Sequence, residues 1–279
     1  MPIIYINSFV FLTASDVVLW TPSELTDLQL WLDAADATTI TESSGLVTQW
    51  DDKSGNGNHM SNTGVVNVSP KYSTTGFNNM PTLEFGFDDY LGKSSPSGLD
   101  SQGDFFYASV FQFSSSTAQW RMIMGGRAAF NSFGSSGMPL LQQMKNANQI
   151  GMHDTDKADV RIKVDVTNIT QGHVATMGRT GGTSGNGGTV TVTASGASGS
   201  YLTTGTQSWN SGANSVFQIG GRQQNATSWL FGSISECIAM QRNATTEERQ
   251  KVEGYLAHKW GLAADLPSDH PYKSSAPTV

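Results

Sequence analysis

Short hydrophobic runs recur along the whole chain, separated by glycine, serine, threonine, asparagine and proline. Residues 160–166 alternate strictly between aliphatic and charged positions, which is the pattern of a half-buried strand. Residues 105–113 and 229–240 are apolar on both faces, which indicates strands covered on both sides. Many short strands with no helices between them predict a sandwich or barrel. Further strands are predicted at residues 28–32, 46–50, 82–87, 121–124, 172–177, 189–193 and 216–220.

The segment 178–200 is rich in glycine, serine and threonine. It is expected to form a long loop, the strand 189–193 and a second loop. Strands of the same type continue after it, so it is not expected to be a linker between domains.

One helix is predicted near the C-terminal end. Thr245 and Glu248 have the spacing of a capping box, in which the threonine hydroxyl accepts from the glutamate amide. Gly261 stands where a helix usually ends. The helix is therefore expected at residues 246–260, lying on a sheet or at its edge. Four apolar residues form its buried stripe at helical spacing: Val252, Tyr255, Leu256 and Trp260.

Composition narrows the class of protein. Of the 279 residues, 14% are charged and 10% are aromatic, whereas disordered chains have high charge and few aromatics. The net charge of −7 argues against a nucleic-acid partner, which needs a basic patch. The single cysteine, Cys237, excludes an intrachain disulfide and is expected to be a small buried hydrophobic residue.

The two ends of the chain differ from its middle. The apolar N-terminus has no basic residue before Lys53, so it lacks the positively charged region of a secretory signal. Residues 1–25 are expected to form an apolar arm that docks on a partner or supplies a first strand. Residues 26–262 are expected to form the sandwich with its helix, and residues 263–279 an extended tail. No run of about 20 apolar residues is present, so no membrane-spanning helix is expected.

Several passages of the chain resemble a known superfamily. They are residues 30–36 (LWLDAAD), 47–59 (VTQWDDKSGNGNH), 217–222 (FQIGGR), 231–238 (FGSISECI), 247–261 (EERQKVEGYLAHKWG) and 266–272 (LPSDHPY). Together they resemble the concanavalin A-like lectin/glucanase superfamily, in the laminin-G-like branch found in marine bacteria and their tailed phages. The resemblance implies an all-β fold: a two-sheet antiparallel jelly-roll sandwich with a concave face and one C-terminal amphipathic helix. It implies no particular ligand, because this superfold hosts many functions.

The loop after the strand 46–50 allows two interpretations. Aspartate, asparagine and glycine bond their own backbone and tolerate positive φ, so the first interpretation is a tight turn satisfied by itself. The alternative is a calcium site, because calcium takes six to eight oxygen ligands. The twelve-residue helix–loop–helix spacing is not met, and no other cofactor is expected. The oxygens would come from Asp51, Asp52, Asn56 and Asn58.

The acidic residues of the chain do not have the spacing of a known catalytic pair. Glycoside hydrolysis needs two carboxylates flanking the bond, and the glucanase branch supplies them from one strand as Glu-x-Asp-x-x-Glu, a pattern absent here. Glu84, Asp88 and Asp89 lack the alternate spacing of one short strand, and Glu236 sits among apolar residues, where a buried ion pair is expected. No Gly-x-Ser-x-Gly, His-Glu-x-x-His or phosphate-loop motif is present. The prediction is that the chain is not an enzyme.

Sugar binding stays open. Lectin sites combine aromatic platforms, which stack on sugar C–H faces, with amides that read hydroxyls. The alternative is that the tryptophans pack in the core or at its rim. The candidate ligand-binding residues are Trp120, Trp209, Trp229, Asn210 and Asn214.

The first functional hypothesis is a structural or adhesion protein of a phage virion, on the capsid or tail. An apolar arm suits docking onto other virion proteins by strand addition or in a groove, and a homo-oligomer with glycans as further partners is expected. The second hypothesis is an extracellular, lectin-like bacterial carbohydrate-binding module. A glycoside hydrolase is the third. Nucleic acid and membrane insertion are not expected.

Overall fold

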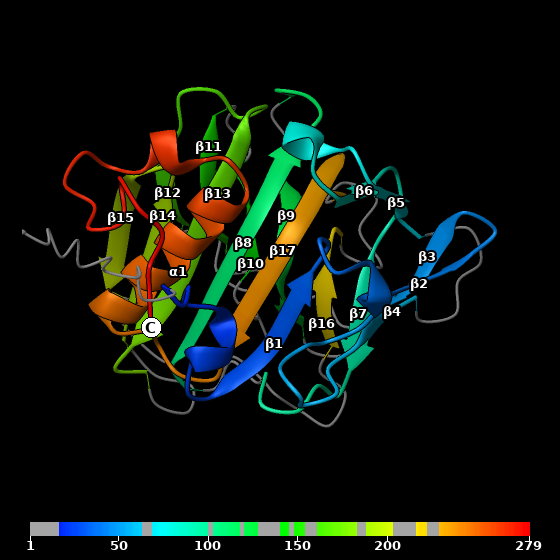
Figure 1. The fold of residues 1–279 in the computed structure, drawn as a ribbon, viewed down its shortest axis with the longest axis horizontal. Coiled ribbons are helices and arrows are strands. Elements are labelled where there is room, and N and C mark those ends of the chain that lie inside the picture. The colour runs from blue at the N-terminus through cyan, green and yellow to red at the C-terminus, as the bar shows by residue number, and fades with distance from the viewer. Residues whose placement is uncertain are drawn as a thin grey trace, which may run out of the picture.

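Two antiparallel β-sheets pack face to face in the computed structural model, and one helix covers part of the outer face of the first sheet (Figure 1). The structure describes residues 17–62, 69–99, 103–117, 120–127, 140–144, 148–153, 161–182, 188–202, 216–221 and 229–279. All strand pairings within these ranges are antiparallel. The predicted all-β sandwich with a C-terminal helix is therefore confirmed.

The first sheet is centred on two long strands. Its order is β15-β14-β13-β8-β17-β6-β5, and β1 pairs with the part of β17 that β6 leaves free. The strands are β1 (Leu28–Asp33), β5 (Lys71–Ser73), β6 (Thr82–Phe85), β8 (Phe105–Phe113), β13 (Gly172–Thr180), β14 (Thr189–Ala194), β15 (Ala197–Leu202) and β17 (Gly232–Met240).

The second sheet has the order β12-β11-β10-β9-β16-β7-β4-β3-β2. Its strands are β2 (Ile40–Ser43), β3 (Leu46–Trp50), β4 (Met60–Ser61), β7 (Leu91–Ser94), β9 (Arg121–Arg127), β10 (Leu140–Gln143), β11 (Gln149–His153), β12 (Arg161–Asp165) and β16 (Val216–Ile219). Short 3-10 helices occur at Pro22–Glu24, Ala37–Thr39, Phe77–Asn79 and Ala263–Asp265.

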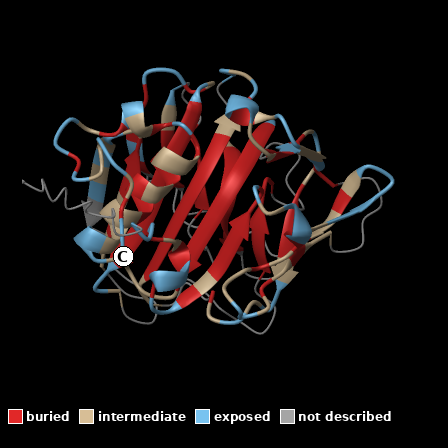
Figure 2. Ribbon diagram, viewed as in Figure 1, coloured by how far each residue is buried: buried red, intermediate tan, exposed pale blue. Residues whose placement is uncertain are grey.

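The core lies between the sheets and under the helix. Every residue of β17 is buried, and β8 is buried except at Gln112; Figure 2 shows both strands red along the middle of the molecule. The apolar character of residues 105–113 and 232–240 thus follows from cover on both sides. Phe231, which belongs to the predicted strand 229–240, lies before β17 and is partly exposed. Cys237 is buried within β17, and burial raises the pKa of its thiol to about 12.

The segment after residue 194 corrects one expectation. The end of the segment 178–200 was expected to be a loop, but residues 197–200 belong to β15 (Ala197–Leu202), which pairs with β14 across a two-residue turn. Ser195 and Gly196 both have positive φ in this turn, at 45° and 81°, as a two-residue hairpin of this twist requires. The paired ladder orders Ser198, Gly199 and Ser200, whose own strand propensity is low.

Helix α1 (Thr246–Lys259) begins at the predicted capping box. The Thr245 hydroxyl accepts from the Glu248 amide at 3.2 Å, and Glu248 accepts in return from the Thr245 amide at 2.8 Å. Arg242 adds two hydrogen bonds to the Glu248 carboxylate. These donors, Arg242 first, lower the pKa of Glu248 to about 2. No helix of the described residues is long and apolar enough to cross a membrane.

A buried glutamate fastens the helix to the sheet. Glu236 of β17 is fully buried and accepts from Trp31 and Trp260 indoles at 2.8 and 2.7 Å. Lys259 and the Tyr255 hydroxyl donate to it at 2.8 and 3.0 Å. Burial raises the pKa of Glu236, although Lys259 opposes the shift. The buried ion pair expected for Glu236 is formed with a base on α1.

Asp33 extends this cluster toward the surface. Its carboxylate is 2.6 Å from the Lys259 ammonium and 3.0 Å from the Lys53 ammonium. Lys53 also lies over the Trp31 ring, 4.4 Å from its centroid. The loop after β3, strand β1 and helix α1 are therefore joined through one network of charges.

Candidate functional site

Two phenylalanine rings stand side by side on the surface at one end of the first sheet. Phe87 follows β6 and Phe231 precedes β17, and these strands pair through Phe85 and Gly232. The ring centroids are 6.2 Å apart, and Phe87 and Phe231 are 58% and 38% exposed. Apolar surface gathered in this way commonly marks a contact site. These two residues are called the phenylalanine pair below.

Trp229 supports the phenylalanine pair. Its ring centroid lies 6.2 Å from Phe87 and 6.4 Å from Tyr90, which is itself buried. A Cβ atom at Gly221 would come within 2.4 Å of the indole ring, so the absence of a side chain at Gly221 makes room for Trp229. The exposed rings thus rest on a packed aromatic base that limits their movement.

The backbone at Phe231 is strained. Its φ is +45°, a region that a bulky residue rarely adopts, at a cost of about 1–3 kcal/mol. The Ser114 amide holds the Phe231 carbonyl at 2.8 Å, and the Arg121 guanidinium lies 5.6 Å from the ring centroid. Arg121 is in turn fixed by two hydrogen bonds to Ser115. Strain of this kind clusters at functional sites.

A polar pocket of about 660 Å³ adjoins the pair. Its size falls within the roughly 300–1,000 Å³ typical of ligand sites. Two of its lining residues, Gly86 and Gly232, are chain neighbours of Phe87 and Phe231. Strand register places four other lining residues in one row across β5, β6, β17 and β8, and paired residues share a face: Lys71, Glu84, Ser233 and Gln112.

The pocket brings together two carboxylates, those of Glu84 and Asp89. Glu84 is exposed on β6. Asp89 accepts from the Gly86 amide at 2.6 Å. Burial raises the pKa of Asp89, the Asp88 charge adds to the rise, and the Gly86 hydrogen bond and Lys71 oppose it. The spacing of Glu84 and Asp89 does not fit one short strand, but the turn after β6 brings Asp89 to the pocket that Glu84 lines.

The predicted sugar-binding residues are not gathered at one place in the described part of the chain. Trp229 is 6% exposed and lies behind the phenylalanine pair. Trp120 is half-buried just before β9. The remaining three candidates lie outside the described residues: Trp209, Asn210 and Asn214.

Asp52, a candidate metal ligand, organises the loop after β3. Its Oδ1 accepts from the amides of Trp31 and Ser54, both at 2.9 Å. Its Oδ2 accepts from the Ser54 hydroxyl at 2.7 Å and from the Asn58 amide at 3.0 Å. Each oxygen of this buried carboxylate thus serves two donors of the protein itself, the arrangement expected of a self-satisfied turn.

The other three candidate ligands also bond within the protein. Asn58 Oδ1 accepts from the Ser97 amide at 2.9 Å, Asn56 donates to the Leu28 carbonyl at 2.7 Å, and Asp51 accepts from Gln49 at 2.6 Å. The described residues contain no group of three His, Cys, Asp or Glu arranged for a metal. The calcium hypothesis stays a prediction.

The comparisons with known proteins concern the fold. The sequence matches no protein-family model, and no curated protein is significantly similar to it. A Trypanosoma rangeli sialidase, in complex with a difluorinated KDN, superimposes with a TM-score of 0.55 and 13% identity over 88% of this chain. A mutant GH54 α-L-arabinofuranosidase, soaked with 4-nitrophenyl α-L-arabinofuranoside, superimposes with a TM-score of 0.52 and 11% sequence identity over 89% of this chain. The chain spans 37% of the sialidase chain and 62% of the arabinofuranosidase chain.

These likenesses correct the prediction that the chain is not an enzyme. The sandwich is shared with chains named as two kinds of glycoside hydrolase, so the absence of the glucanase carboxylate motif does not exclude catalysis. The pocket lining offers two carboxylates, those of Glu84 and Asp89, which do not have that motif's spacing. At 11–13% identity, the likeness itself establishes the fold alone.

Proposed function

We propose that this chain is a carbohydrate-recognition domain that holds a neutral glycan on the phenylalanine pair. The observation that carries the proposal is the exposure of Phe87 and Phe231 beside a pocket lined by Glu84 and Asp89. Likeness to a sialidase and an arabinofuranosidase supports it, because the proteins with this fold include ones named for their action on glycans.

The chemistry of the surface suits a sugar. The faces of aromatic rings carry partial negative charge, which attracts the polarised C–H groups on a pyranose or furanose face. Carboxylates such as Glu84 and Asp89 accept hydrogen bonds from the hydroxyl groups of a sugar. Lys71 and Gln112 can donate hydrogen bonds to the oxygens of those hydroxyl groups. The pocket lining carries two carboxylates, of Glu84 and Asp89, and one ammonium, of Lys71. This balance disfavours an anionic sugar, so a neutral glycan is the proposed ligand.

Removing both rings tests this proposal. The Phe87→Ala/Phe231→Ala double variant is expected to bind its glycan about 10- to 100-fold more weakly, because each aromatic contact contributes about 0.5–1.5 kcal/mol beyond burial. A glycan array on the wild type identifies the ligand, and calorimetry gives both Kd values. Leu19→Ala, another exposed apolar residue, is the control and should bind normally. A wild-type array with no hit, or equal affinity of the double variant, contradicts the proposal.

A second candidate function is glycoside hydrolysis in the same pocket. It is favoured by the presence of two carboxylates, those of Glu84 and Asp89, in the lining of one pocket. The pKa of Asp89 is raised, which is what a general acid needs. Wild-type protein is then expected to release reducing ends from at least one of laminarin, agarose and neutral 4-nitrophenyl glycosides. Asp89→Asn should reduce the rate at least about 100-fold, whereas Asp165→Asn, exposed and outside the pocket lining, should retain most of it. No turnover by the wild type removes this candidate.

The concanavalin A-like family, the virion location, the oligomeric state and the docking role of residues 1–25 stay predictions. The described part of that arm lies against the end of the chain, with Leu19 bridging Thr278 and the Trp20 amide donating to the Pro277 carbonyl. Capsid, portal or tail genes beside the coding gene would support a virion role. A neighbourhood of glycan-degradation genes would instead favour an extracellular module.

A further inference from the structure

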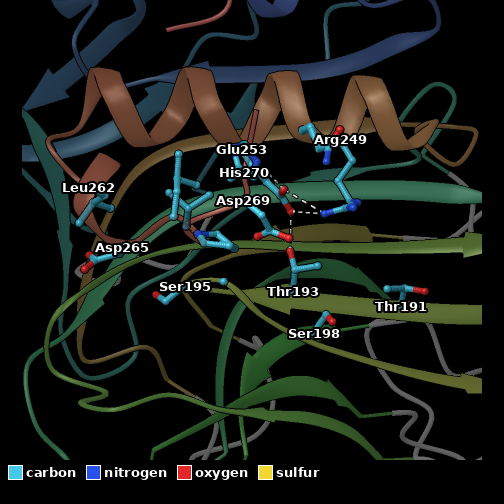
Figure 3. A pocket seen from close by; sticks show the side chains of 15 residues that line it. Thr191, Thr193, Ser195, Ser198, Arg249, Glu253, Leu262, Asp265, Asp269 and His270 are labelled. Atoms are coloured by element: carbon cyan, nitrogen blue, oxygen red, sulfur yellow. Dashed lines mark hydrogen bonds and ion pairs between the residues drawn. The ribbon is translucent and has the colours of Figure 1, made fainter. Parts of the chain in front are cut away.

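A second pocket, of about 400 Å³, lies between helix α1, the segment after it and the strands β13, β14 and β15. Figure 3 shows α1 along one side and the strands along the other. Glu253 of α1 forms a fixed wall, because it accepts from Thr193 at 2.8 Å, from Arg249 at 2.8 and 2.9 Å and from His270 at 3.3 Å. No residue of this pocket lines the pocket beside the phenylalanine pair.

Ser195, which lines this pocket, is hydrogen-bonded to a buried histidine. The distance from its Oγ to Nδ1 of His173 is 2.7 Å, and Nε2 of His173 is 3.0 Å from the Asn168 carbonyl oxygen. A carbonyl oxygen can only accept, so Nε2 carries the hydrogen. In the neutral ring Nδ1 is then an acceptor, and the Ser195 hydroxyl donates to it. This is the order of a nucleophile, a base and a group that orients the base.

The histidine is held in the state that a base requires. His173 is 3% exposed. Burial lowers the pKa of His173, although its hydrogen bonds to Asn168 and Ile169 and the charge of Asp265 oppose the shift. The neutral imidazole, whose Nδ1 lone pair accepts from Ser195, is therefore the state present at neutral pH.

The turn that carries Ser195 also offers a donor for a developing negative charge. Ser195 has a φ of +45°, and its own amide is bonded to the Val174 carbonyl at 3.1 Å. The next residue, Gly196, lines the pocket, and its amide has no hydrogen-bond partner among the described residues. The amide of the residue after the nucleophile is a recurring part of oxyanion holes.

We propose that Ser195 is the nucleophile of an acyl-ester hydrolase site, with His173 as its base. Ser195 Oγ attacks the acyl carbon and forms the new C–O bond, while Nδ1 of His173 takes the hydroxyl proton. The Gly196 amide donates to the oxyanion. The bond to the leaving alcohol breaks, and the alcohol takes the proton from His173. Water then attacks the acyl-serine, its proton returns through His173 to Oγ, and the carboxylic acid leaves.

The lining of the pocket defines the class of ester. Asp265 and Asp269 are exposed, and their carboxylates have no hydrogen-bond partner among the described residues. They repel anionic substrates and can accept from hydroxyl groups of the alcohol part. Val174, Leu262 and Leu266 supply apolar surface for a short acyl chain. The substrate class is a short-chain acyl ester of an uncharged polyhydroxy alcohol.

Labelling of the wild-type protein tests the nucleophile without a variant. A fluorophosphonate probe, which loses fluoride to an activated serine, is expected to add one phosphonyl group, located on Ser195 by peptide mass spectrometry. Ser198 lines the same pocket and is exposed without a histidine partner, so it should stay unmodified. Labelling of Ser198 and Ser195 alike, or of neither, overturns the proposal.

Ester hydrolysis gives the second readout. Wild-type protein is expected to hydrolyse 4-nitrophenyl acetate and an acetylated monosaccharide, and Ser195→Ala to lose at least about 100-fold of that rate, while Ser198→Ala retains it. Equal rates for the wild type and Ser195→Ala would overturn the proposal. The Phe87→Ala/Phe231→Ala variant should keep the esterase rate, so a failure of the glycan-binding proposal and a failure of this one are distinguishable.

Discussion

Replacing Glu236 by alanine is expected to lower the free energy of unfolding by about 3–5 kcal/mol, because breaking a buried ion pair leaves its partner charge without compensation. The Lys259 ammonium and the indole groups of Trp31 and Trp260 would lose an acceptor inside the protein. A polar contact between α1 and the first sheet would be lost with them. Urea unfolding, monitored by tryptophan fluorescence, measures the change.

The matched control is a glutamate on the exposed side of the same helix. Glu247 is 2.9 Å from Lys251 and its side chain is 74% exposed, so Glu247→Ala should change stability by no more than about 0.5 kcal/mol. A loss below about 1 kcal/mol for Glu236→Ala would mean that Lys259 and the indoles find other partners, which contradicts a fastening role for Glu236.

Replacing Asp52 by alanine is expected to cost about 2–4 kcal/mol, because four donors lose their charged acceptor. Three of these donors are backbone amides, of Trp31, Ser54 and Asn58, so the contact between the loop after β3 and strand β1 would be weakened. Asp51→Ala, which removes a half-exposed carboxylate bonded to Gln49, should cost less than about 1 kcal/mol.

Thermal melting of the Asp52 variant with calcium and with a chelator separates the two interpretations of this loop. If Asp52 only organises the turn, the wild-type melting temperature is the same in both conditions. A wild-type melting temperature that rises with calcium, with no rise in Asp52→Ala, would establish the calcium site and contradict the turn interpretation.

The strands and the helix whose own residues carry a clear pattern of apolar and polar positions could be predicted from the sequence. The alternation in residues 160–166 corresponds to β12, the doubly apolar residues 105–113 coincide with β8, and the Thr245 capping box begins α1. Strand β15 was not predicted, and residues 197–200 were expected to be a loop, because the ladder with β14, rather than their own propensity, makes them a strand. Pairing energy between segments is not visible in either segment alone.

The candidate sites depend on distances that no local pattern encodes. Phe87 and Phe231 are far apart in the chain and meet because β6 pairs with β17. Ser195 and His173 meet because β14 lies beside β13, without any serine-hydrolase motif. One of the predicted tryptophans, Trp229, packs against the phenylalanine pair. It is not itself exposed, and only an exposed ring can contact a ligand.

The chain's only thiol, that of Cys237, is buried in β17 and its pKa is raised to about 12. At neutral pH this thiol is protonated and inaccessible to solvent, so alkylating reagents would not modify it. A cysteine introduced beside either pocket would then be the sole reactive thiol of the folded molecule. A fluorophore or spin label could be attached there in one step and would report occupancy of that pocket directly, with no need to remove a native residue first.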